Sequence, residues 1–250
     1  MNERLFINDA EKIIPPVNDS PYKRILAIGD VHGALDKLES LLEKISPSND
    51  DLVIFLGDYF NFAEIKRKNL ETLLRLAELS ERKNFIFLLG NTDETAMKVF
   101  FCEPEVALKM FSRYFFRNQP ELVNAYAQNV PKVFYDFMTG LKPSHLITIG
   151  GRKYFFCHAG IKFDKPLELQ NKDYVVGNLG CASFYRNYAG DDVIVVGHKS
   201  PKKLSEQFDG NKPLKVPDKN ILMLDTRAKK KDGKLSCVDL LSGEFWQDDC

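Results

Sequence analysis

The chain has 250 residues, and 35 lysines and arginines balance 35 aspartates and glutamates, so the formal net charge is zero. Nucleic-acid-binding proteins are usually basic, and we therefore expect no nucleic-acid partner. Hydrophobic residues make up 44% and charged residues 28%, values that exclude a long disordered chain. No apolar run approaches the roughly 20 residues of a membrane-spanning helix. Five cysteines without CxxC spacing favour reduced thiols. We therefore expect no membrane partner and a cytoplasmic location.

The first half of the chain predicts alternating strands and helices. Residues 1–22 are expected to form a loose arm, because prolines at 15, 16 and 21 interrupt regular structure, and 23–250 to form a single domain. Three apolar runs predict strands, and amphipathic patterns between them predict helices that begin near residues 35 and 70. The three runs are 25–28, 52–56 and 85–89. Runs that are apolar throughout are typical of strands covered by helices on both faces. The order predicts an α/β fold.

The rest of the chain predicts a cap and further strands. Residues 93–142 are rich in aromatic side chains at helical spacing, which favours a small helical cap over an aromatic binding surface. Two hairpins are expected, one around Gly150-Gly151 and one around Ser242-Gly243. A two-residue turn in the first would pair position 145 with 156, and a four-residue turn would pair it with 158. A three-residue loop would turn His145 away from that face. Further strands are expected at 193–196 and 221–224, and Lys229-Lys230-Lys231 is expected to form a solvated turn.

Polar residues follow five predicted strands at their carboxyl ends, where α/β sheets bind ligands. Asp30 and His32 are two positions apart, so an extended backbone would point both side chains to one side. Any one of these residues by itself is most simply interpreted as a buried polar side chain with satisfied hydrogen bonds. Six such residues at five strand ends instead favour a shared ligand-binding site. The six are Asp30, His32, Asp58, Asn91, His158 and His198.

The chemistry of these six residues is that of a metal centre. Carboxylates, imidazoles and one amide oxygen, with no thiolate, suit Mn, Fe or Zn. The set is large enough for two ions if one carboxylate bridges them. Two ions about 3.5–4 Å apart can clamp the attacking and leaving oxygens of a displacement at phosphorus.

The order of the motifs resembles the calcineurin-like metallophosphoesterases. The sequence contains GDVHG, GDY, GNTD, CHAG and VGH in that order. It is most similar to the phosphoprotein phosphatase branch, with its bacterial Ser/Thr phosphatases and symmetrical diadenosine tetraphosphatases. The segments LDT, GKL, DL and GEFW near the end are also similar to that branch, and the resemblance covers about 24–247.

This resemblance implies a four-layer α/β/β/α sandwich and a phosphorylated substrate. It implies one metal ion at Asp30, His32 and Asp58, and a second at Asp58, Asn91, His158 and His198. Manganese is the expected metal, with iron or zinc as alternatives. Among the metal ligands, Asp58 and Asn91 are also expected to take part in catalysis.

Three positions depart from the family pattern. The family has a leaving-group histidine where this chain has Thr92, and an acid and a phosphate-binding arginine where it has Asn61 and Phe62. A threonine hydroxyl is a very poor acid, and general acid catalysis is typically worth 10²–10⁴-fold. Thr92 therefore occupies a catalytic position without its usual group. Arg186 is the expected replacement for a phosphate-binding arginine.

Two further residues could compensate for these losses. Lys199 could offset phosphate charge, although a solvated lysine is the simpler interpretation. His145 would share a face with His158 in the two-residue hairpin register, although a structural histidine is again simpler.

The sequence thus predicts a dimetal phosphoric ester hydrolase with atypical activity on substrates that have good leaving groups. The alternatives are a nucleotide pyrophosphohydrolase or phosphodiesterase, and a catalytically weak metal-bearing module that binds phosphorylated partners.

Overall fold

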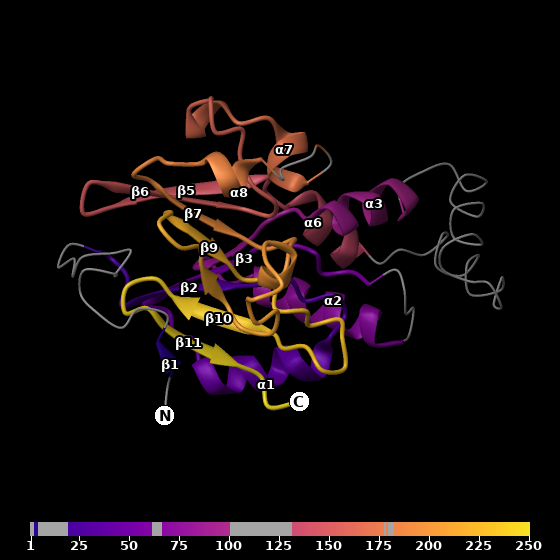
Figure 1. Ribbon diagram of the computed structural model, residues 1–250. Helices are drawn as coiled ribbons and strands as arrows, with labels where there is room; N and C mark the ends of the chain where they lie inside the picture. Colours follow the sequence, from indigo (N-terminus) through magenta and orange to yellow (C-terminus); the bar gives the residue numbers. More distant parts are fainter. Residues whose placement is uncertain (1–2, 5–19, 62–66, 101–131, 178, 180–182) are drawn as a thin grey trace.

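Two β-sheets stacked face to face form the centre of the protein, and helices cover the two outer faces (Figure 1). The computed structural model describes residues 3–4, 20–61, 67–100, 132–177, 179 and 183–250. The layers follow the order helix, sheet, sheet, helix, so the expected four-layer α/β/β/α sandwich is confirmed.

The first sheet has six strands in the order β1-β11-β10-β2-β3-β4. Its parallel part consists of β2, β3 and β4, joined by helices as predicted, and β10 and β11 add an antiparallel hairpin at the β2 edge. The strands are β1 (Glu3–Arg4), β2 (Arg24–Ile28), β3 (Asp51–Phe55), β4 (Phe85–Phe87), β10 (Ser236–Asp239) and β11 (Glu244–Gln247).

The second sheet has five strands in the order β5-β6-β7-β9-β8. β5 and β6 form the predicted hairpin with a two-residue turn, because Ile149 pairs with Arg152 and His145 with Phe156. β6, β7 and β9 are parallel to one another. The strands are β5 (Ser144–Ile149), β6 (Arg152–Cys157), β7 (Val193–Val196), β8 (Leu214–Lys215) and β9 (Ile221–Met223).

The helices of the outer layers are short. The helices on the side of the first sheet are α1 (Leu35–Ile45), α2 (Arg67–Ser80), α3 (Asn91–Phe100) and α6 (Lys132–Thr139). Those on the second sheet are α7 (Lys172–Val176) and α8 (Phe184–Asn187), with the 3-10 turns η2 (Leu167–Leu169) and η3 (Pro201–Lys203).

Three buried hydrophobic clusters hold the four layers together. Alternate residues of β2 face opposite ways: Leu26 and Ile28 pack against the helices, whereas Ile25 and Ala27 pack against the second sheet. The third cluster joins the outer face of the second sheet to α7 and α8. The second sheet, rather than a helical layer, therefore covers the other face of β2 and β3. This explains why these strands are apolar on both faces, and it corrects the expectation of helices on both.

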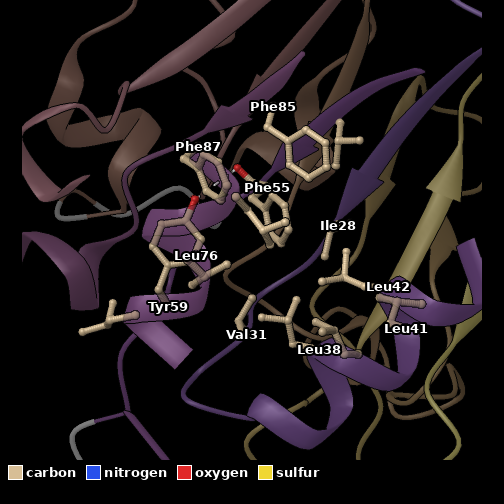
Figure 2. Close-up of a cluster of buried hydrophobic side chains, with 14 of the residues drawn as sticks. Ile28, Val31, Leu38, Leu41, Leu42, Phe55, Tyr59, Leu76, Phe85 and Phe87 are labelled. Carbon is tan, nitrogen blue, oxygen red and sulfur yellow. Dashed lines mark hydrogen bonds between the residues drawn. The ribbon is translucent and has the colours of Figure 1, made fainter. Parts of the chain in front are cut away.

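The first cluster contains a group of aromatic rings beside the loop that follows β3 (Figure 2). The rings of Phe55 and Phe87 stack with centroids 4.8 Å apart. The Tyr59 ring lies 6.0 Å from Phe87 and 5.6 Å from Phe137. Its hydroxyl donates to the Leu88 carbonyl oxygen at 2.8 Å. Tyr59 thereby fixes the loop that carries Asp58.

The expected arm and cap are described only in part. Within 1–22, Glu3 and Arg4 form β1 and pair with β11, so this part of the arm is a short strand and not loose chain. Within 93–142, α3 and α6 are helical, and most of the aromatic residues between them lie outside the described residues. Phe137 of α6 is buried in the first cluster. In the described parts of the chain, no helix has the length and apolarity needed to cross a membrane.

Candidate metal centre

The two sheets bring all six predicted ligands to one place, at the carboxyl ends of their parallel strands. Asp30 follows β2, Asp58 follows β3, and Asn91 begins α3 just after β4. His158 and His198 follow β6 and β7 of the second sheet. The backbone N–H of His198 donates to both carboxylate oxygens of Asp30, at 3.1 and 3.0 Å, and so ties the two sheets together at the site.

The local backbone differs from the extended geometry expected at Asp30 and His32. His32 has φ of 49°, and Asp58 and His198 have φ of 54° and 63°. These values lie in the left-handed region, which costs a residue with a side chain on the order of 1 kcal/mol. The N–H groups of Val31 and His32 both donate to the Asp58 carbonyl oxygen, at 3.2 and 2.8 Å, and hold the turn. His32 therefore approaches Asp30 through a tight turn, and not through strand alternation.

Two glycines are required by close approach at the site. A Cβ on Gly197 would lie 2.0 Å from Oδ1 of Asp30, and one on Gly90 would lie 2.2 Å from Oδ1 of Asp58. Neither glycine has a positive φ. Their role is to make room for the two carboxylates.

The first half of the site consists of Asp30, His32 and Asp58, all buried. Nδ1 of His32 lies 3.1 Å from the carbonyl oxygen of Phe60, which can only accept, so Nδ1 of the neutral ring carries the proton. Nε2 therefore presents a lone pair to carboxylate oxygens of Asp30 at 3.7 Å and Asp58 at 3.6 Å. One ligand atom from each of these three residues lies within 4.8 Å of the others, a cluster that could hold a metal ion.

The second half of the site is built in the same way around His158. Its Nδ1 lies 2.9 Å from the Leu56 carbonyl oxygen, so Nε2 carries the lone pair. That lone pair faces Oδ1 of Asn91 at 3.1 Å and Oδ1 of Asp58 at 3.3 Å, two oxygens that can only accept. Nδ1 of His198 joins them, 2.9 Å from the Asn91 oxygen. Asp58 thus contributes one oxygen to each half.

The electrostatics keep the imidazoles of His32 and His198 neutral and disfavour a bare negative charge on Asp30. Burial lowers the pKa of His32, and burial followed by repulsion from His158 lowers the pKa of His198 to about 4. Burial and then the nearby Asp225 carboxylate raise the pKa of Asp30. Lone pairs of neutral imidazoles and carboxylates that face one another repel, and a bound cation relieves that repulsion. The carbonyls behind the histidines orient the rings as outer-shell partners of metal ligands commonly do. The residues present therefore fit bound divalent cations.

Asp93 supports the site and was not predicted as a functional residue. Its carboxylate accepts backbone N–H groups of Asp58 at 2.7 Å, Tyr59 at 2.8 Å and Gly90 at 3.0 Å. Asp93 lies in the first turn of α3. Its side chain reaches back to the N–H of Gly90, which precedes the helix, as the acidic residue of a helix capping box does. The GNTD motif contained this signal: an acid three residues beyond the glycine that ends a strand.

Asp225 and Lys229 also lie at the site and were not predicted there. Asp225 is buried directly beyond β9, and the strand-end argument used for the other ligands would have found it. Nζ of Lys229 lies 3.5 Å from Nε2 of His32. Lys229 is exposed, as expected for a solvated turn, but this turn lies against the metal centre. No local pattern in the sequence indicated this.

The residues expected to replace the lost groups are only partly placed. Oγ of Thr92 donates to the Phe60 carbonyl oxygen at 3.3 Å, and its N–H donates to Asp58 at 3.0 Å. Phe62 lies outside the described residues. Arg186 is exposed on α8, and its side chain has no hydrogen bond or ion pair with another residue in the described ranges.

Two other residues were considered as compensating groups. His145 is half-buried, with its ring 6.3 Å from the Phe156 ring, which suits the simpler structural interpretation. Lys199 is half-buried, with Nζ 5.8 Å from the centroid of the Tyr185 ring. Their roles at the site stay predictions.

The site's arrangement is that of a phosphoesterase, and comparison with known proteins identifies the class. The calcineurin-like phosphoesterase family matches residues 23–224, and the chain belongs to this family. It is therefore a phosphoesterase that acts on phosphorylated substrates, in a family that uses divalent metals.

Several solved structures share the fold at low sequence identity. A candidate diadenosine tetraphosphatase is 20% identical with a TM-score of 0.63, over 92% of this chain and 94% of its own. A cold-active protein tyrosine phosphatase is 18% identical with a TM-score of 0.54, over 94% and 81%. A Ser/Thr phosphatase from Saccharomyces cerevisiae is 16% identical with a TM-score of 0.55, over 88% and 74%. No curated protein sequence matches the chain.

Proposed function

We propose that the protein is a dimetal phosphoric ester hydrolase that acts on substrates whose leaving groups are stable as anions. One divalent ion, manganese by preference, would be held by Asp30, His32 and Asp58. The other would be held by Asp58, Asn91, His158 and His198. One observation carries the proposal. Nε2 of His32 faces one carboxylate oxygen of Asp58, and Nε2 of His158 faces the other.

The chain's own residues prepare the site for phosphate chemistry. Divalent ions, when bound, would lower the pKa of water and neutralise charge that develops at phosphorus. The Phe60 and Leu56 carbonyls hold His32 and His158 with their lone pairs inward. The N–H of Thr92 fixes Oδ1 of Asp58, the carboxylate common to both halves. Burial excludes water from competing with these contacts.

The leaving-group preference follows from Thr92. Its hydroxyl proton points to the Phe60 carbonyl, and a hydroxyl cannot protonate a departing alkoxide at neutral pH. Aryl phosphates and phosphoanhydrides leave as stabilised anions and need no such proton. One protein of the same fold is a protein tyrosine phosphatase, and a phosphotyrosine ester has an aryl leaving group.

The test is a series of phosphate monoesters with manganese-loaded protein. Aryl phosphates should be hydrolysed faster as the leaving-group pKa falls, and all of them far faster than a phosphoserine peptide. Equal rates on aryl and alkyl esters, with chemistry rate-limiting, would show that another residue supplies the proton. Metal bound without turnover of any ester or anhydride would favour the phospho-binding module instead.

A further inference from the structure

A hollow of about 480 Å³ opens beside the metal centre, and its lining is strongly basic. His198 and Asp225 line the end nearest the metal centre. The other lining residues include five cationic side chains, from the loop after β7 and the loop between β9 and β10. These are Lys199, Lys203, Arg227, Lys229 and Lys230. Five cations face one carboxylate here, although the chain as a whole is neutral.

Several of these charges are not neutralised within the described parts of the chain. Lys203 and Lys230 are exposed and form no ion pair with a described residue. Arg227 is partly paired, since its guanidinium lies 3.2 Å from Asp232. By contrast, the neighbouring Lys202, which does not line the hollow, lies 3.5 Å from Glu206.

The loop that presents the cations is held in place. Nζ of Lys37, from α1, donates to the carbonyl oxygens of Lys230 at 2.8 Å and Gly233 at 2.6 Å. A Cβ on Gly233 would lie 1.9 Å from the Arg227 carbonyl oxygen, so the loop closes tightly on itself. A fixed loop loses little conformational entropy when its side chains bind an anion.

Two of the cations are close to the metal centre. Nζ of Lys229 lies 3.5 Å from Nε2 of His32, and Lys199 directly follows His198 in the chain. Lys203, Arg227 and Lys230 also line the hollow. An anion bound there would be separate from a phosphoryl group at the metal centre but could belong to the same molecule.

We propose that this hollow is a second anion subsite, which binds a further phosphate of the substrate beyond the one that is hydrolysed. The ligand class is therefore a small molecule with linked phosphates, such as a phosphoanhydride. The proposal rests on the proposed function, because it takes the metal centre as the place of hydrolysis. Charge-assisted contacts from lysine and arginine to phosphate are about twice as strong as neutral ones. They would supply affinity that Phe62, at the family's arginine position, cannot.

The test is calorimetric binding of methylenediphosphonate and methylphosphonate to manganese-loaded protein. The matched variants are Lys203→Gln/Lys230→Gln, which removes two charges from the hollow, and Lys202→Gln/Lys231→Gln, which removes two charges beside it. We expect wild type to bind the diphosphonate about tenfold more tightly or better, through two charge-assisted contacts. The first variant should lose most of that preference and the second should keep it. Because metal chelation contributes equally to both variants, it cannot produce this difference.

Two outcomes would overturn the subsite. One is wild-type protein without a preference for the diphosphonate, and the other is an equal loss in both variants, which would indicate only long-range charge. Circular dichroism confirms folding of each variant, and only the difference between the two variants separates the subsite from metal chelation. Aryl phosphate hydrolysis is measured in parallel. Hydrolysis without the preference refutes the subsite alone, whereas the preference without hydrolysis refutes the proposed function and leaves the anion site standing.

Discussion

Buried aspartates lie at both ends of β3, and their surroundings differ. Asp51, at the amino end, accepts hydrogen bonds from the Arg24 guanidinium at 3.0 and 2.6 Å and from the N–H and hydroxyl of Ser48 at 2.7 and 2.9 Å. Asp58, beyond the carboxyl end, accepts the N–H of Thr92 and otherwise faces lone pairs of His158 and His32.

The difference separates a structural carboxylate from a functional one. Burying a charge is costly unless it is paired, and the chain itself pairs Asp51. Asp58 receives one backbone N–H, and its two oxygens face the Nε2 atoms of His158 and His32, where a cation could bind. Burial alone therefore does not mark a functional carboxylate, whereas burial among acceptors does.

The largest expected effect is on activity, from Asp58→Asn. An amide offers one neutral oxygen in place of two charged ones, so one half of the site loses a ligand and the other keeps a weaker one. Hydrolysis of an aryl phosphate should fall more than about 100-fold, beyond the 10–100-fold typical of losing an outer-shell partner. Aryl phosphate turnover measures the effect, and urea titration of the metal-free variant checks that it is folded.

His32→Ala is the matched control for this variant, since His32 contributes to one half of the site only. Metal analysis should find close to one ion per chain in His32→Ala and markedly less than that in Asp58→Asn. If the two variants retained equal metal, Asp58 would not be shared between the two halves.

In contrast to Asp58→Asn, the variant Asp51→Asn should weaken the fold and leave the metal centre intact. The variant leaves the Arg24 guanidinium without its ionised partner, a loss of about 2 kcal/mol in the free energy of unfolding. Metal content and kcat on an aryl phosphate should match wild type. A large fall in activity at unchanged stability would mean that the two ends of β3 are not independent.

The contribution of Asp51 should also depend on pH with a defined sign. Burial by itself raises the pKa of Asp51, but hydrogen bonds from Arg24 and Ser48 outweigh it and hold the pKa below its ordinary value. A lowered folded-state pKa stabilises above the unfolded value, about 3.9. The stability gap between wild type and Asp51→Asn should stay constant from pH 7 to about 5 and shrink below about pH 4. A gap that widens in acid would contradict the assignment.

The smallest expected effect is that of Thr92→His, which adds one missing group to the carboxyl end of the sheet. The chain has Asn61 where the family has an acid that orients this histidine, and Phe62 where the family has a phosphate-binding arginine. The gain from Thr92→His on a phosphoserine peptide should stay below about tenfold, well short of the full effect of general acid catalysis. Adding Asn61→Asp and Phe62→Arg should raise kcat/KM by more than the product of the single gains. A full gain from Thr92→His alone would show that other residues already orient the acid and bind phosphate.

Most of the strands, the βαβαβ order and the six polar strand-end residues could be predicted from the sequence. Apolar runs and glycine-bounded motifs are local signals, and parallel strands must end at a common edge, so the meeting of these six residues could be inferred without coordinates. The hairpin at His145 was predicted locally, but its register was not, because it depends on whether the turn holds two, three or four residues. The structure has a two-residue turn.

The tertiary structure alone decided what surrounds those residues. That the second sheet covers β2 and β3, that Asp93 holds three loop N–H groups, and that the turn at Lys229 meets His32 all depend on segments far apart in sequence. The left-handed backbone at His32, Asp58 and His198 was equally invisible, since no residue type there demands it. Local sequence patterns specify which residues end a strand, whereas long-range packing sets which lone pairs and charges face each other. The chemistry of this site depends on that long-range packing.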